Sequence, residues 1–216
     1  MADLTLTTFD WVPEMPRGFV RDLRVRWALE EAGFEYEPLL ISAADQKSDN
    51  YRSLQPFGQV PAYEEDGLAL FESGAIVLHI AERSAALMPP DPGAQARVKT
   101  WIFAALNTIE PHIQNLAEID LFHADKAWAK VRRPDVVKMV NTRLANLSSV
   151  LDGREYLEDR FTAADLLMTT VLRILRHTDI VAQHPVLEAY RDRCEARPAF
   201  ARAMADHLAP FAANAP

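Results

Sequence analysis

Cysteine and histidine, the residue types that most often bind metals, offer little in this chain. Its only cysteine is Cys194, and a single thiol excludes an internal disulfide and any zinc site built from several cysteines. The six histidines are scattered without the spacing that metal ligands need. We therefore predict no metal site.

Two arginines stand where positive charge could be useful. Arg17 and Arg21 lie one turn apart, at the predicted start of a helix over residues 19–32. Free amides at such a start, here around Phe19 and Val20, carry about half a positive charge and lower the pKa of a nearby thiol. These groups could stabilise a thiolate, or both arginines could be solvated surface residues.

The elements around these residues alternate between strand and helix. Gly33 is placed to cap the helix over residues 19–32, and Asp66-Gly67 is a strong two-residue hairpin signal. The other predicted elements are strands over residues 4–9 and 34–41, hairpin strands over residues 61–65 and 68–71, and a helix over residues 74–83.

The pattern changes after a proline-rich linker at residues 88–93. Beyond it we find helical periodicity and no alternating strand. Thr162 and Asp165 have the spacing of a capping box, which marks one helix start clearly. The predicted fold class is α/β plus all-α, with an α/β domain over residues 1–88 and an all-helical domain over residues 92–216.

Composition limits the function classes. A net charge of −8 argues against nonspecific nucleic-acid binding, which needs a basic face. The N-terminus lacks the pattern of a secretory signal, and no stretch approaches the ~20 apolar residues of a membrane span. We expect a cytoplasmic protein with no membrane and no nucleic-acid partner.

Four segments, in this order and spacing, resemble the glutathione transferase family. They are RVRWALEEAG at residues 24–33, PFGQVP with LFESGAI at residues 56–61 and 70–76, FTAADL at residues 161–166, and residues 185–200 ending in RPAF. The resemblance covers nearly the whole chain, with residues 94–158 the least distinctive. It implies a thioredoxin-like first domain and a glutathione transferase C-terminal domain.

The resemblance also implies a glutathione site. It makes Val60-Pro61 a cis peptide bond, which leaves the amide and carbonyl of Val60 free to pair with the cysteinyl backbone of glutathione. Glu72 and Ser73 fall where the family holds the γ-glutamyl end. Gln59, and more loosely Gln46, match positions that hold the glycine end.

The catalytic position departs from the family pattern. Family members place Tyr, Ser or Cys there, but the register falls on Phe19, and none of these three lies between Thr8 and Arg26. A cysteine-based mechanism is therefore excluded at this position. We hypothesise that the Phe19 amide, helped by Arg17 or Arg21, holds the glutathione thiolate.

The family's second domain walls the pocket for the electrophile, which is predicted to be small and hydrophobic. The candidate pocket residues are Trp11, Trp101, Asn107 and Glu110. Ordinary core packing is the alternative for these side chains.

Conjugation of glutathione to a hydrophobic electrophile is the expected function, with glutathione as co-substrate and the protein as a homodimer. Two other classes stay open. One is a glutathione-dependent isomerase or lyase, because residues 24–26 also resemble maleylacetoacetate isomerases. The other is a noncatalytic relative that binds protein partners.

Overall fold

The described part of the chain divides into two compact units. The structure is a computed structural model and describes residues 4–215. One unit contains the residues up to Met88 together with those from Arg197 onward, and the other contains Pro89–Ala196.

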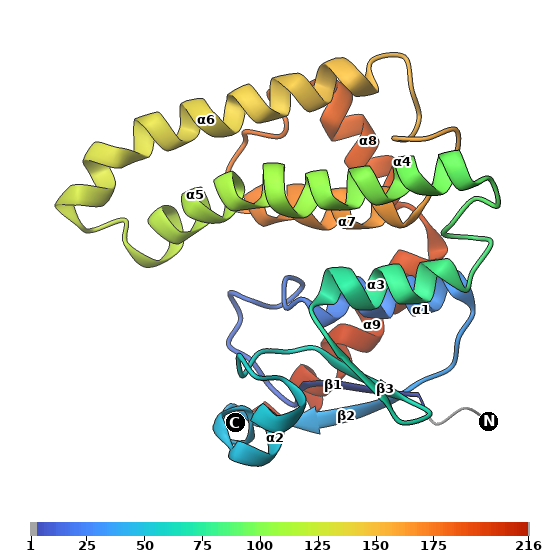
Figure 1. The fold of residues 1–216 in the computed structure, drawn as a ribbon. Coiled ribbons are helices and arrows are strands. Elements are labelled where there is room, and N and C mark those ends of the chain that lie inside the picture. Colours follow the sequence, from blue (N-terminus) through green and yellow to red (C-terminus); the bar gives the residue numbers. More distant parts are fainter. Residues whose placement is uncertain (1–3, 216) are drawn as a thin grey trace. The chain divides into compact units, whose positions relative to one another are not determined.

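A mixed four-stranded sheet forms the centre of the first unit (Figure 1). Its strands are β1 (Thr5–Phe9), β2 (Glu37–Ile41), β3 (Ala62–Glu65) and β4 (Leu68–Phe71), in the order β2-β1-β3-β4. β1 and β2 run parallel because a helix crosses over between them, whereas β3 is antiparallel to both β1 and β4. Asp66 and Gly67 both have positive φ in the tight turn of the predicted hairpin.

The helices of the first unit include the last helix of the chain. They are α1 (Asp22–Ala32), the 3-10 turn η1 (Asp45–Lys47), α2 (Asp49–Leu54), α3 (Ser73–Glu82) and α9 (Pro198–Ala213). Figure 1 shows α1, α3 and α9 together beside the sheet. Trp27 of α1 contacts the edge of the Phe200 ring of α9, with ring centroids 4.8 Å apart.

The contacts place α9 in the first unit. The division predicted from the sequence instead assigned it to the all-helical domain over residues 92–216. The face of α9 that carries Phe200, Ala203 and Phe211 is buried. Arg197, just before the helix, donates two hydrogen bonds to the Glu31 carboxylate, at 2.6 and 2.7 Å. Burial of one apolar helix face against α1 places residues 197 onward with the first unit.

The second unit is all helical in its described residues. Its helices are α4 (Pro92–Phe103), the π-helix η2 (Ala104–Ile109), α5 (Glu110–Phe122), α6 (Ala127–Leu151), α7 (Ala163–Arg173), the 3-10 turn η3 (Ile174–His177) and α8 (Pro185–Glu195). The fold class predicted from the sequence is confirmed. Pro111 follows η2 and has no N–H for an α-helical bond, which accounts for the local change of helix type.

The predicted capping box is present at the start of α7. The Thr162 hydroxyl accepts from the Ala164 amide at 3.3 Å, and Asp165 accepts from the Thr162 amide at 2.9 Å. The same carboxylate also accepts from the Leu157 amide and the Tyr190 hydroxyl, both at 2.9 Å. Asp165 thus joins the loop before α7 to α8.

Candidate glutathione site

The β3–β4 hairpin brings together two segments that the sequence singled out. Its register pairs Ala62 with Phe71, so the residues just before Ala62 and just after Phe71 meet at one end of the hairpin. These are Val60-Pro61 and Glu72-Ser73. The bond between Val60 and Pro61 is cis. Within residues 4–215 neither backbone group of Val60 makes a hydrogen bond.

The N-terminus of α3 lies next to these unpaired backbone groups. Glu72 precedes the helix at φ 70° and ψ 110°, a conformation that costs a non-glycine residue about 1–3 kcal/mol. Its side chain is exposed and does not cap the helix. Ser73 is 4% exposed, and its hydroxyl accepts from Arg24 Nη1 at 3.5 Å. The helix dipole and Arg24 both favour an anion here.

The loop before Val60 is held by the segment from η1 to α2. Gln46 donates its side-chain N–H to the Gly58 carbonyl at 2.5 Å, and Tyr51 donates its hydroxyl to the Gln59 carbonyl at 2.6 Å. Burial raises the pKa of Tyr51 to about 12, so the hydroxyl stays protonated and can donate. The structure therefore places the side chain of Gln46, from η1, against the backbone of the loop that contains Gln59.

The start of α1 differs from the prediction. The helix begins at Asp22, not at residue 19, because the preceding residues form tight turns. In these turns the Phe19 amide donates to the Pro16 carbonyl at 2.9 Å. The prediction that the Phe19 amide is free was wrong. The Val20 amide, by contrast, donates no hydrogen bond within the described residues.

The two candidate arginines differ in their surroundings. Arg17 is half-buried and donates its Nε–H to the Val12 carbonyl at 3.2 Å. Among the described residues no carboxylate forms an ion pair with Arg17. Arg21 is exposed and is engaged in a further interaction. Of the two arginines, Arg17 is thus the more available cation in the segment before α1.

Trp11 lies in the same loop and is half-buried. Its indole nitrogen is enclosed and has no hydrogen-bond partner in the described part of the chain. Thr8, which is fully buried at the end of β1, also has a hydroxyl without a hydrogen-bond partner among residues 4–215. Buried donors without partners are uncommon, and they often mark sites where a water or a ligand binds.

The other candidate pocket residues belong to the second unit. Trp101 is half-buried in α4, Asn107 is exposed in η2, and Glu110 is buried at the start of α5. The π-helix between them alters the spacing that an unbroken α-helix would impose, and such segments are frequent at functional sites. Their role in binding an electrophile stays a prediction.

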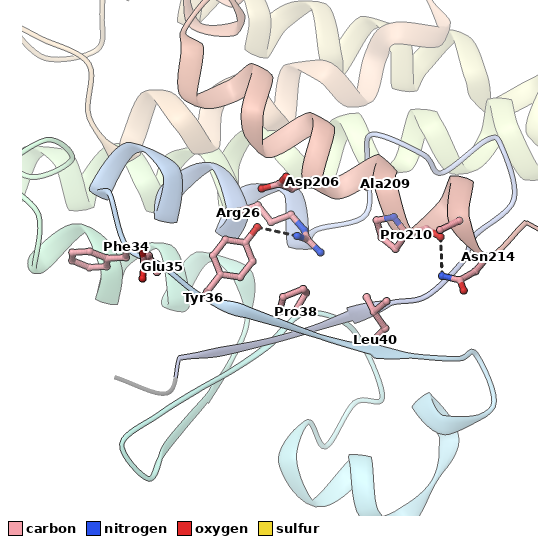
Figure 2. A pocket seen from close by; sticks show the side chains of 11 residues that line it. Arg26, Phe34, Glu35, Tyr36, Pro38, Leu40, Asp206, Ala209, Pro210 and Asn214 are labelled. Atoms are coloured by element: carbon pink, nitrogen blue, oxygen red, sulfur yellow. Dashed lines mark hydrogen bonds between the residues drawn. The ribbon is translucent and has the colours of Figure 1, made fainter. Parts of the chain in front are cut away.

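A separate cavity of 590 Å³ opens on the first unit, between α9 and the strand β2 (Figure 2). Its walls include Arg26, Tyr36 and Pro210, and none of the predicted glutathione residues lines it. Arg26 donates to the Tyr36 hydroxyl at 2.9 Å, and burial raises the pKa of Tyr36. This cavity is therefore distinct from the candidate glutathione site.

No group of three or more His, Cys, Asp or Glu side chains within residues 4–215 is arranged to hold a metal ion. In the same residues no helix combines the length and apolar character needed to span a bilayer.

Comparison with known families decides the identity of the chain. Residues 5–82 match the family described as glutathione S-transferase, N-terminal domain, and residues 102–198 match glutathione S-transferase, C-terminal domain. The chain belongs to the glutathione S-transferase superfamily. The hairpin, the start of α3 and the capping box thus lie within matched glutathione S-transferase domains.

Individual relatives agree with this membership. The chain is 30% identical to glutathione S-transferase F13 of Arabidopsis thaliana over 200 residues, covering 82% of the chain and 87% of the relative. It is also 30% identical to the maleylacetoacetate isomerase of Rhizobium meliloti, over 87% of the chain and 92% of the relative. A glutathione transferase from Burkholderia graminis, solved with two glutathione molecules bound per subunit, is similar in structure. It is 27% identical, with a TM-score of 0.81 and coverage of 94% and 88%.

Proposed function

We propose that this glutathione S-transferase superfamily member binds glutathione at the end of the β3–β4 hairpin and transfers it to a hydrophobic electrophile. One observation carries the proposal. The hairpin register sets the unpaired backbone groups of Val60 beside the N-terminus of α3, which begins with a buried serine. The glutathione-bound structure from Burkholderia graminis supports the choice of ligand.

Each part of the tripeptide has a partner in this arrangement. The amide and carbonyl of Val60 pair with the cysteinyl backbone in the manner of an added strand. The Ser73 hydroxyl and the α3 N-terminus hold the γ-glutamyl carboxylate, while the exposed Glu72 carboxylate accepts from the ammonium group. Gln46 and Gln59 contact the glycine end.

Activation of the thiol falls to the start of α1. The Val20 amide takes the place first assigned to Phe19, and Arg17 adds a full positive charge. A mostly ionised thiol at pH 7 needs a pKa about one to two units below the free value of ~8.5, or about 1.4 kcal/mol per unit. A helix terminus and one cation together can supply this amount.

The reaction follows from these groups. The bound thiol loses its proton to water, and the thiolate sulfur attacks an electrophilic carbon. A sulfur–carbon bond forms, and the leaving group departs with its electron pair. Proximity of the two bound reactants supplies much of the acceleration.

Isomerisation is the second candidate reaction, because the chain is 30% identical to a maleylacetoacetate isomerase. In that case the thiolate adds to a cis double bond, the adduct rotates, and the thiolate leaves. A noncatalytic role is the third possibility, since no Tyr, Ser or Cys stands at the usual catalytic position. Product analysis with an activated aryl halide and with a cis-enone distinguishes transferase from isomerase.

A homodimer and a cytoplasmic location belong to the proposal as well. The exposed Phe57 ring, 67% accessible and edge-on to Phe71, is an apolar feature that a second copy could cover.

Calorimetry tests the binding step. We expect the chain to bind glutathione, and Ser73→Ala to weaken binding about tenfold through loss of a hydrogen bond to a charged group. Ser53→Ala is the matched control, because Ser53 is an exposed serine of α2 whose hydroxyl, among the described residues, bonds only to the Asn50 carbonyl. Absence of binding heat in the unmodified chain would refute the proposal and favour a protein-binding role.

A further inference from the structure

A buried histidine connects the last helix to the loop that precedes α1. His207 of α9 is fully buried. Its Nδ1 lies 3.0 Å from Asp22 Oδ2 at the start of α1, and its Nε2 lies 3.1 Å from the Gly18 amide nitrogen. The imidazole therefore bridges a helix and a loop that are far from it in the sequence.

The contacts determine where the imidazole proton resides. The Gly18 N–H can only donate, so Nε2 must be the acceptor, and the proton must be on Nδ1, facing Asp22. Burial alone raises the pKa of Asp22, but His207 and Arg26 lower it, and the net pKa is below the ordinary value. Asp22 is thus a carboxylate, paired with Arg26 Nε at 2.8 Å.

The loop held by His207 carries the groups proposed to activate the thiol. Gly18 lies between Arg17 and the turn that presents the Val20 amide, and it adopts a φ of 79° that favours glycine. Asn214, the residue that follows α9, donates to the Asp10 carbonyl at the other end of the loop, at 3.3 Å. The loop over residues 10–21 is therefore hydrogen-bonded both to α9 and to the residue directly after it.

We infer that His207 is a positioning residue for the glutathione thiol, acting through the Gly18 amide to fix Arg17 and the Val20 amide. This inference rests on the proposed function. Positions near a reacting atom must be held within about 0.5 Å, and a loop needs support from a second layer of contacts to achieve this. His207 and Asp22 form that layer here.

Two substitutions separate the two hydrogen bonds of the imidazole. His207→Gln keeps an acceptor near the Nε2 position, toward Gly18. His207→Asn keeps a donor near the Nδ1 position, toward Asp22, and loses the acceptor. Arg202→Ala is the matched control for docking of α9, because Arg202 forms an exposed ion pair with Glu30 at 2.6 Å. Within the described residues no hydrogen bond or ion pair joins Arg202 to the loop.

The first readout is hydrogen exchange of the Gly18 amide by NMR, which requires no glutathione. We expect the amide to exchange at least tenfold faster in His207→Asn than in the unmodified chain, and to change less than threefold in His207→Gln and Arg202→Ala. Unchanged protection of Gly18 in His207→Asn would refute the hydrogen bond.

The second readout is the pKa of the bound glutathione thiol, followed by ultraviolet absorbance of the thiolate. We expect His207→Asn to raise this pKa by about one unit, a tenfold loss of thiolate at fixed pH below the pKa. His207→Gln should leave it within about 0.3 units. Equal shifts in both variants would overturn the inference, because they would indicate a merely structural role.

The variant Asn214→Ala, at an exposed residue, releases the other end of the loop without risk to folding. An unchanged thiol pKa in both Asn214→Ala and His207→Asn would also overturn the inference.

These readouts keep the two hypotheses apart. If the unmodified chain binds no glutathione, the proposed function fails and the role of His207 at the thiol fails with it, whatever the exchange of Gly18. If glutathione binds normally and only the His207 expectations fail, the proposed function stands and the inference alone is refuted.

Discussion

At the residue scale, Arg17 and Arg21 precede α1, and no Tyr, Ser or Cys lies between Thr8 and Arg26. The sequence was sufficient to exclude Tyr, Ser and Cys there and to point to Arg17 and Arg21. It could not show that the Phe19 amide donates a hydrogen bond to the Pro16 carbonyl within a turn. That bond depends on the backbone conformation of the loop, which the residue types do not specify. The contact between Arg24 and Ser73 was also missed, since the two residues meet only once α1 and α3 pack.

The charge of Arg17 leads to a prediction about the bound thiol. Arg17→Ala should raise the pKa of glutathione bound to the chain by about 0.5–1 unit, because an opposite charge within ~4–6 Å favours the ionised form. Arg21→Ala should have a smaller effect, since Arg21 is exposed and otherwise engaged. Ultraviolet titration of the thiolate measures the thiol pKa in each variant. An unchanged pKa in the double variant Arg17→Ala/Arg21→Ala would refute this account of activation.

At the element scale, a buried carboxylate joins the hairpin that follows Val60 to the end of α3. Glu65 accepts from Arg83 Nη2 at 2.8 Å and from the Tyr63 hydroxyl at 2.7 Å. Its bonds with Arg83 and Tyr63 outweigh burial and lower its pKa from 4.5 to about 2. This network lies at the opposite end of the hairpin from Val60, so it supports the hairpin without entering the site.

This shift gives the stability of the chain a dependence on pH. The pKa of Glu65 is lower in the folded state than in the unfolded state, so its stabilisation is complete above pH 4.5 and is lost as pH falls toward about 2. We expect about 1–2 kcal/mol, because Arg83 is 40% exposed and solvent screens the pair. Urea unfolding at pH 3 and pH 6 should show a smaller difference in Glu65→Gln than in the parent. Glu64→Gln serves as the neighbouring control, and an equal difference in Glu65→Gln and the parent would contradict the assignment.

The cap of α7 illustrates an element that the sequence did predict, because its signal lies within four residues. The sequence did not reveal that Asp165 also binds Leu157 and Tyr190, which come from other segments. Asp165→Ala should therefore cost about 3 kcal/mol of unfolding free energy, more than the ~0.5–2 kcal/mol of an ordinary cap. Denaturant unfolding checks this value against the exposed control Asp152→Ala. A loss below 1 kcal/mol would show that the buried partners contribute little.

At the scale of the whole molecule, the last helix completes the first unit. The alternation of strands and helices, the linker and the helical second half were all visible in the sequence, because each is a local pattern. The attachment of α9 to α1 was not, since a helix of the apolar pattern of residues 198–213 can pack on any apolar partner. The contact between Phe200 and Trp27 and the pair of bonds between Arg197 and Glu31 decide that partner.

The placement of α9 predicts which elements lose hydrogen-exchange protection when a cavity is made in its buried face. Phe200→Ala should lower the unfolding free energy by about 3–5 kcal/mol, as other buried phenylalanines do. The loss of hydrogen-exchange protection should appear in α1, whereas α5, in the second unit, should keep its protection under native conditions. Phe122→Ala, at an exposed ring, is the control and should change stability by less than about 0.5 kcal/mol. Equal loss of protection in α5 and α1 would contradict the grouping of α9 with the first unit.

Amide resonances observed during a glutathione titration test the central claim most directly. In an isotope-labelled sample, the account predicts that the amides of Val60 and Ser73 shift first and furthest, because their groups pair with the cysteinyl backbone and the γ-glutamyl carboxylate. Shifts confined to other parts of the chain, or no shifts at saturating glutathione, would contradict it.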